Sequence, residues 1–189
     1  MQSDARKNLK TVDITPYLQD LQTVVERLSQ SRLAEKTVQS YRGSLIIFFA
    51  WCAQYRQCKK VADMNYDDFR DFLSFLDMDR PEPRTINVFI AALKKLVYYA
   101  LGQRWKSWEI PCRKYNRILP KVPTLEEVQR IVESCETKEQ KALVMLLLST
   151  GIRISEAAAL VYSDIRRKDD KIYIRPGKGR SDRFVPLSK

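Results

Sequence analysis

The sequence of 189 residues contains no histidine. This absence excludes serine–histidine–aspartate and cysteine–histidine nucleophile pairs in their usual form, and every metal site built on histidine ligands. The cysteines form no C-x-x-C pair, so neither a zinc ribbon nor a redox dithiol is expected. Isolated thiols are typical of small buried residues in a reducing cytosol; here they are Cys52, Cys58, Cys112 and Cys135. We therefore predict no metal and no cofactor.

Long apolar runs and acidic residues are also scarce. The longest apolar run, Leu45 to Ala53, is well short of the roughly 20 residues that a membrane-spanning helix needs. The polar N-terminus does not resemble an export signal. We therefore expect a cytoplasmic protein with no membrane partner. Lys and Arg number 34 against 23 Asp and Glu, a net charge of +11, which is typical of proteins that bind a polyanion such as nucleic acid.

The first hundred residues have the periodicity of helices. Apolar residues recur every three to four positions after Thr15, from about Ala34 to Gln54, after Asn65, and from about Pro83 to a stop at Gly102. Four amphipathic helices in a stretch of this length form a small bundle-like domain. We place this domain at residues 1–102.

Residues 103–123 differ in composition from what precedes and follows them. They contain six basic residues, one acidic residue and three prolines. Prolines disfavour a continuous helix. We predict an extended basic linker between two domains.

Residues 124–189 predict a second domain of α+β type. Capping boxes at Thr124 and Thr137 each begin a helix, Gly151 ends the second one, and a short helix follows at about 155–160. The period then changes to two in Lys171–Arg175 and Arg183–Leu187, which predicts a two-stranded antiparallel hairpin. Such a domain has an open sheet edge and little core. We predict a mainly α protein whose second domain is truncated.

Arg153 and Glu156 form the first candidate site. Arg153 lies between a helix stop and the next helix start, where rigid elements would present its guanidinium to a phosphate. Glu156 would hydrogen-bond this guanidinium from behind. On spacing alone, an ordinary exposed ion pair explains the two residues at least as well.

Lys178 is the second candidate. Gly177 and Gly179 flank it in the predicted hairpin turn, and glycines allow the backbone to approach a ligand closely. A lysine at such a tip would reach into a DNA groove. A solvated turn lysine is the simpler explanation on this observation alone.

Taken in order, these stretches resemble the tyrosine recombinases, also called phage-type integrases or Xer-like recombinases. Thr150-Gly-Ile-Arg153-Ile-Ser-Glu156-x-x-x-Leu160 is similar to the family's first catalytic motif, and Gly177-Lys178-Gly-Arg-Ser-Asp-Arg183-x-Val-Pro-Leu187 to its lysine-bearing hairpin. Residues 37–51 and 84–87 resemble its helical core-binding (SAM-like) domain, and residues 119–127 resemble the segment that leads into its catalytic domain. The resemblance covers nearly the whole chain.

The resemblance implies a mechanism without metal or cofactor, in which a tyrosine attacks a DNA phosphodiester and forms a 3′-phosphotyrosine. It implies that Arg153 stabilises charge on the phosphoryl oxygens, that Lys178 is the general acid, and that Glu156 orients Arg153. The family's later His-x-x-Arg segment and its tyrosine nucleophile have no match here. We therefore expect a chain that binds DNA and does not cleave it.

The resemblance also implies double-stranded DNA as partner, with a homotetramer on DNA for the full-length protein and a monomer for this chain alone. One alternative is a naturally short regulator or remnant that occupies recombination sites; a type IB topoisomerase is a weaker one, because the helical domain resembles that of a recombinase. Candidate DNA contacts lie at helix starts and in basic segments: Thr37, Arg84, Thr85, Asn87, Arg113, Lys114, Arg117 and Arg180.

Overall fold

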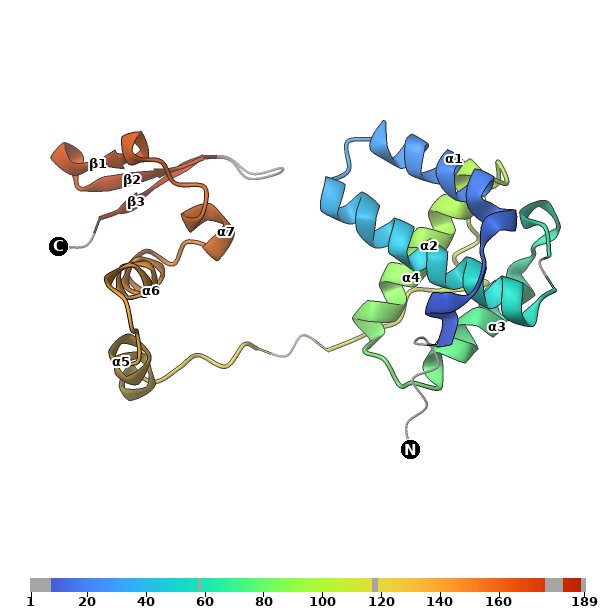
Figure 1. The fold of residues 1–189 in the computed structure, drawn as a ribbon, viewed down its shortest axis with the longest axis horizontal. Coiled ribbons are helices and arrows are strands. Elements are labelled where there is room, and N and C mark those ends of the chain that lie inside the picture. Colours follow the sequence, from blue (N-terminus) through green and yellow to red (C-terminus); the bar gives the residue numbers. More distant parts are fainter. Residues whose placement is uncertain (1–7, 58, 117–118, 176–181, 188–189) are drawn as a thin grey trace. The chain divides into compact units, whose positions relative to one another are not determined.

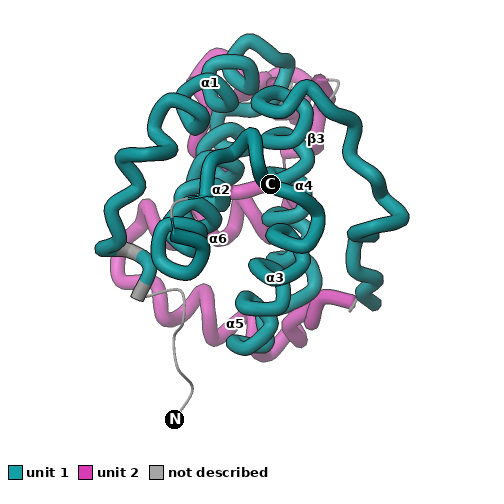
Figure 2. The backbone as a smooth tube through the Cα atoms, turned by 90° about the vertical axis from the view of Figure 1, so that its right-hand side faces the viewer, with its two compact units in different colours: residues 1–117 teal, residues 118–189 magenta. Residues whose placement is uncertain are grey.

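A computed structural model describes residues 8–57, 59–116, 119–175 and 182–187 (Figure 1). The contacts divide the chain into two units, unit 1 at residues 1–117 and unit 2 at residues 118–189 (Figure 2). The described residues are mostly helical, with one small antiparallel sheet in unit 2. The predicted fold class is confirmed.

The described residues of unit 1 form four α-helices: α1 (Leu18–Ser29), α2 (Glu35–Tyr55), α3 (Tyr66–Asp77) and α4 (Pro83–Tyr99). The helix predicted to begin at Thr15 starts three residues later, because Thr15–Tyr17 forms a 3-10 turn, η2. Two further 3-10 turns are η1 (Asn8–Thr11) and η3 (Val61–Asp63). Asn65, the residue before the third predicted helix, caps α3: its side chain accepts from the backbone N–H of Asp68, whose carboxylate accepts from the N–H of Asn65.

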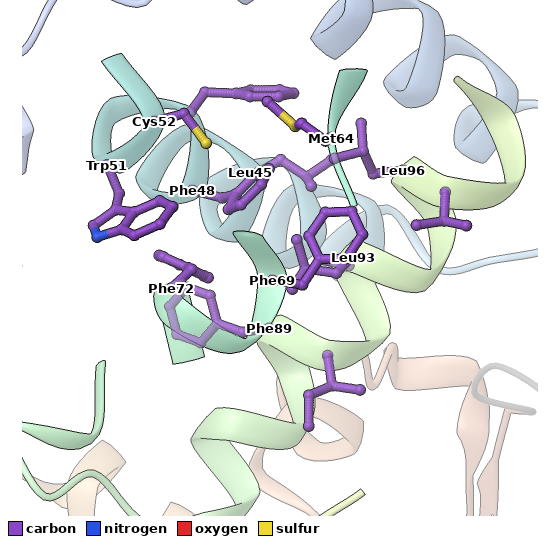
Figure 3. Packing of buried hydrophobic residues seen from close by; sticks show 14 of the residues in the cluster. Leu45, Phe48, Trp51, Cys52, Met64, Phe69, Phe72, Phe89, Leu93 and Leu96 are labelled. Atoms are coloured by element: carbon purple, nitrogen blue, oxygen red, sulfur yellow. The ribbon is translucent and has the colours of Figure 1, made fainter. Parts of the chain in front are cut away.

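An aromatic cluster forms the centre of unit 1 (Figure 3). The ring of Phe48 on α2 is fully buried, and its centroid lies 5.7 Å from that of Phe69 and 5.1 Å from that of Phe72, both on α3. Leu93 and Leu96 of α4 belong to the same buried cluster. The large apolar faces of three helices therefore meet in one core, which fixes where the start of each helix is presented.

The first part of segment 103–123 is anchored to unit 1. The Trp105 ring lies 5.3 Å from the Tyr66 ring and 5.8 Å from the Phe69 ring, and Ile110 is buried in the core. Trp105 Nε1 also donates to the Ile110 carbonyl at 3.3 Å. The described residues of the segment contain neither helix nor strand, but its apolar side chains bind residues 105–110 to the helical unit.

Unit 2 contains α5 (Leu125–Glu133), α6 (Lys138–Thr150), α7 (Ile154–Ala157), β1 (Ile165–Arg166), β2 (Lys171–Ile174) and β3 (Arg183–Pro186). The strands form an antiparallel sheet in the order β1-β2-β3, in which Ile172 is paired with both Ile165 and Val185. The predicted hairpin is β2–β3. Strand β1 was not predicted, because two residues are too few to show an alternating pattern.

The helix ends of unit 2 follow the local signals in the sequence. Thr124 and Thr137 form the predicted capping boxes, and Gly151 ends α6 with φ +63°, in the left-handed region that favours glycine. The helix predicted at about 155–160 is only the single turn α7. Two 3-10 turns, η4 (Tyr162–Asp164) and η5 (Arg167–Asp169), precede β1 and β2.

The core of unit 2 is small. Its buried apolar residues are Ile152, Ile172, Ile174 and Val185, and α5 and α6 contain no buried residue. Leu143, Met145 and Leu148 of α6 are 40%, 53% and 47% exposed. A helical stretch that is apolar all round is normally covered on all sides, so residues 142–148 of α6, which are all apolar, are covered less than their composition favours. None of the described helices is both long and apolar enough to cross a membrane.

The aromatic cluster generates a stability prediction. Phe48→Ala should lower the free energy of unfolding of unit 1 by about 3–5 kcal/mol, because it leaves a cavity among rings that hold three helices together. Denaturant unfolding monitored by tryptophan fluorescence measures this, since Trp51, Trp105 and Trp108 all lie in unit 1.

Met78→Ala is the matched control, because Met78 is 70% exposed in the same unit. Its effect should stay within about 0.5 kcal/mol. Equal losses for the two variants would contradict the assignment of Phe48 to the centre of the core.

Candidate functional site

Arg153 is held at the junction between α6 and α7. Gly151 turns the chain out of α6, the Ile152 side chain is buried in the core of unit 2, and Arg153 follows in an extended conformation before the first residue of α7. The Arg153 side chain is 54% exposed. The buried neighbour fixes the backbone of Arg153 while its guanidinium remains accessible to a ligand.

The carboxylate of Glu156 connects Arg153 to a second arginine, Arg183 at the start of β3. Oε1 of Glu156 accepts from Arg153 Nη1 at 3.0 Å and from Arg183 Nη1 at 3.1 Å. Oε2 accepts from the Arg153 backbone N–H at 2.9 Å and from Arg183 Nη2 at 2.8 Å. The four bonds fill the four acceptor positions of an ionised carboxylate. The structure thus brings the predicted pair together and adds a residue that the prediction lacked.

These contacts shift the ionisation of Glu156. The hydrogen bonds from Arg183, and then the bond from the Arg153 backbone N–H, lower the pKa of the Glu156 carboxyl well below its ordinary value, to about 2. Hydrogen bonds and positive charges both favour the ionised form. Two guanidinium groups share this single negative charge, so the cluster keeps one positive charge in excess. Such an arrangement suits a bound phosphate.

A strand pattern in the sequence would have identified Arg183. Successive side chains of a strand point to opposite faces of the sheet, so Arg183 lies on the same face as Val185. Val185 is buried and belongs to the core of unit 2. An arginine at an inward position of a strand needs a partner, and that partner is Glu156.

The other strand of the hairpin is also anchored by an arginine. Asp164 at the end of η4 is buried and accepts from Arg175 Nε at 3.2 Å and Nη2 at 3.0 Å. The Val161 backbone N–H, 3.0 Å from Asp164 Oδ2, contributes most to lowering the pKa of the Asp164 carboxyl, and Arg175 lowers it further. Both described strands of the hairpin are therefore tied to a carboxylate outside the sheet. Lys178 and Arg180 lie outside the described residues, as does Arg117.

The predicted contacts at helix starts are half-buried or exposed. Thr37 lies in the first turn of α2 and Thr85 in the first turn of α4, and both are half-buried. Arg84 is exposed, and its Cζ lies 4.8 Å from the centroid of the Tyr115 ring. Stacking on a ring restricts the guanidinium plane while leaving its N–H groups available to a ligand.

Asn87 and Arg113 are bound to each other. Asn87 Nδ2 donates to the Arg113 carbonyl at 3.0 Å, and Asn87 Oδ1 accepts from the Arg113 backbone N–H at 2.7 Å. Arg113 Nη2 lies 2.5 Å from a carboxylate oxygen of Asp77 on α3. The Asn87 amide thus fixes the basic segment against α4, next to the exposed Lys114. This contact within the chain was not predicted.

The described residues offer no group of three or more Cys, Asp and Glu side chains that could hold a metal ion. The expectation of buried thiols holds for Cys52 but not for Cys112, which is exposed, or for Cys135, which is partly exposed. Both lie on segments with few buried neighbours. Cys58 is outside the described residues.

Comparisons with known proteins cover most of the chain. Residues 18–107 match the family described as "Phage integrase, N-terminal SAM-like domain", and residues 121–189 match the "Phage integrase family". The tyrosine recombinase XerD of Rickettsia bellii is 24% identical over 179 residues, covering 86% of this chain and 57% of that protein. The tyrosine recombinase XerA of Pyrococcus horikoshii is 32% identical over 123 residues, covering 64% of this chain and 43% of that protein.

Among solved structures, a crystal structure of XerA recombinase is 26% identical, with a TM-score of 0.42, and the match covers 91% of this chain and 60% of that one. The chain spans 43–57% of the length of the two relatives just named.

The low pKa of Glu156 predicts how the stability of unit 2 depends on pH. In the unfolded chain a glutamate titrates near 4.3, whereas in the folded chain the pKa is about 2. The unfolded state therefore binds the proton first as the pH falls. The stabilisation from the Glu156 cluster is complete above about pH 5 and is lost progressively between about pH 4.5 and 2.

Hydrogen exchange of the β2 and β3 amides over this pH range measures the effect in the full chain. Glu156→Gln should be less stable than the wild type above pH 5, and the difference should shrink toward pH 2. Glu139→Gln removes an exposed carboxylate of α6 and should leave the pH dependence of the wild type in place. A Glu156 carboxyl that titrates near 4.3 by NMR would contradict the assigned contacts.

Proposed function

Because this chain belongs to the phage integrase family of tyrosine recombinases, we propose that it is the DNA-binding N-terminal portion of an enzyme that cuts and rejoins DNA at specific sites. The observation that carries this proposal is the cluster in which Glu156 holds two arginines with one positive charge in excess. A cluster of this kind is suited to a phosphodiester. The family membership supports the proposed reaction, and the geometry of the cluster supports phosphate binding at Arg153.

In the proposed reaction, a tyrosine loses its hydroxyl proton to a base or to water and its oxygen attacks the phosphorus atom. A P–O bond forms to the tyrosine, and the bond to the 5′-oxygen breaks. Arg153 stabilises the negative charge that develops on the phosphoryl oxygens. Lys178 gives a proton to the departing 5′-oxygen, a role assigned from its place in the motif alone. The reverse reaction on another strand rejoins the DNA, so the energy of the broken bond is kept.

We propose that the nucleophile belongs to a longer protein, of which this chain is a part. None of the nine tyrosines has the sequence context of the nucleophile of the family. Two observations support this: the relatives are longer than the chain, and residues 142–148 of α6 are all apolar but none of them is buried. Further protein packed on α5 and α6 would cover these side chains.

The proposed DNA contacts of unit 1 lie around the start of α4. Arg84 is stacked on Tyr115, and Lys114 is exposed beside the Asn87–Arg113 contact. Both cations would reach phosphates, with Thr37 and Thr85 at the starts of their helices as further contacts. We propose a cytoplasmic protein that is monomeric as this chain and tetrameric on DNA in its full-length form.

Duplex binding tests the proposal. The 189-residue chain should bind a 30-base-pair duplex with an affinity that falls steeply as salt rises, because binding releases counterions from the phosphates. Arg84→Ala and Lys114→Ala should each weaken binding and reduce the slope of log K against log salt by about one. Fluorescence anisotropy at several salt concentrations measures both quantities.

Arg27→Ala is the matched control, since it removes the same charge from an exposed position on α1. It should leave the slope nearly unchanged. Binding that does not depend on salt, or equal effects of all three variants, would argue against the proposed interface.

A trapping experiment tests the absence of the nucleophile. The chain incubated with nicked duplexes that carry candidate recombination sites should give no covalent protein–DNA adduct on a denaturing gel. An adduct would show that one of the nine tyrosines is reactive, and the proposal of an incomplete active site would then be wrong.

A further inference from the structure

We infer that Arg183 is a positioning residue of the phosphate site and that it acts through the carboxylate of Glu156 to hold the guanidinium of Arg153 toward DNA. The inference rests on the proposed function. It assigns a role to a residue that the first catalytic motif does not contain, and it connects that motif to the sheet of unit 2.

The hydrogen bonds assign the two arginines different tasks. Arg183 binds both oxygens of Glu156 through two guanidinium nitrogens, which fixes the plane of the carboxylate. The side chain of Arg153 uses a single nitrogen, Nη1, on one oxygen of the same carboxylate. The direction of the Arg153 guanidinium therefore depends on a carboxylate that Arg183 holds in place.

Exposure agrees with this division. The Arg153 side chain is 54% exposed, the Arg183 side chain 38%, and Glu156 only 12%. The most exposed member is the one able to contact a large ligand. The least exposed member lies between the two arginines and has no acceptor position left for another donor.

Charge gives Arg183 a second effect on Arg153. A carboxylate paired with one arginine neutralises it, and the pair then attracts a phosphate only weakly. With Arg183 present, the negative charge of Glu156 is shared and the cluster keeps a positive charge. Without Arg183, the whole negative charge of Glu156 would neutralise the positive charge of Arg153.

Strand β3 supplies the rigid base. Arg183 is paired with Ile174 and lies on the same face as Val185, and both apolar residues are buried in the core of unit 2. A fork-shaped contact from a paired strand is more precise than one from a loop. The core of the sheet therefore fixes Arg183, Arg183 fixes Glu156, and Glu156 fixes Arg153.

A double-mutant cycle on duplex binding tests the inference. The variants are Arg153→Ala, Arg183→Ala and the double substitution, measured by anisotropy against a 30-base-pair duplex over a range of salt. Arg153→Ala should weaken binding several-fold and reduce the salt slope by about 0.9, the value for one phosphate contact. Arg183→Ala should reproduce most of this loss, and the double variant should bind within about twofold of Arg153→Ala.

Arg183→Lys separates positioning from charge. A lysine keeps the charge but is a point donor without the planar fork. If Arg183 positions Glu156, the lysine variant loses nearly as much affinity as the alanine variant. Arg166→Ala is the control, because it removes an equal charge from the same sheet. The Cζ atom of Arg166 lies 4.9 Å from the centroid of the Phe184 ring. This substitution should cost little binding affinity.

The ionisation of Glu156 gives a second measurement of the same variants that needs no DNA. In Arg183→Ala and Arg183→Lys, NMR titration should show the pKa of Glu156 rising from about 2 toward its ordinary value, because Arg183 is the largest cause of the shift. Amide spectra of β2 and β3 show whether each variant is folded. If the alanine variant is unfolded, the lysine variant decides.

The outcomes are distinct. A wild-type chain that does not bind the duplex, or an Arg153→Ala variant that binds like the wild type, overturns the proposed function and the inference with it. If Arg153→Ala weakens binding while the Arg183 variants bind like the wild type, only the inference is overturned. A double variant whose loss is the product of the two single losses makes Arg183 an independent phosphate contact and also overturns the inference.

Discussion

The carboxylate of Glu156 is the contact on which the geometry of unit 2 depends. It accepts four hydrogen bonds, two from the residue that precedes α7 and two from the first residue of β3. Among the residues of this unit that the structure describes, four apolar residues are buried in its core. With so little apolar burial, charged hydrogen bonds determine how the sheet lies against α7. The contact that organises the fold is thus also the one that organises the candidate site.

In unit 1, apolar packing holds the elements together. Rings from α2 and α3 meet around Phe48, and Trp105 carries the following segment onto this core. The amide of Asn87 then fixes the backbone at Arg113. The basic segment therefore leaves the helical unit from a defined place, and Arg84 stacks on Tyr115 of this segment, next in sequence to the exposed Lys114.

The sequence by itself determined where the long helices lie and where several of them begin and end. Capping boxes at Asn65, Thr124 and Thr137, and the left-handed glycine after α6, involve residues three or four positions apart, so each signal is complete within one turn. The alternation of β2 and β3 is equally local. The mainly helical fold class and the hairpin were predictable for this reason. So was the pairing of Arg153 with Glu156, which are three residues apart.

Only the tertiary structure decided which distant residues share these sites. Arg183 reaches Glu156 across 27 positions of sequence, and Asn87 reaches Arg113 across 26. Strand β1 exists because it pairs with β2, and its two residues carry no pattern of their own. The prediction placed residues 105–110 in an extended basic linker, because composition records charge and proline but not that Trp105 packs on Tyr66 and Phe69 or that Ile110 is buried. Local hydrogen bonds can be inferred from neighbouring residues, whereas a contact between distant residues forms only when the core has brought their backbones together.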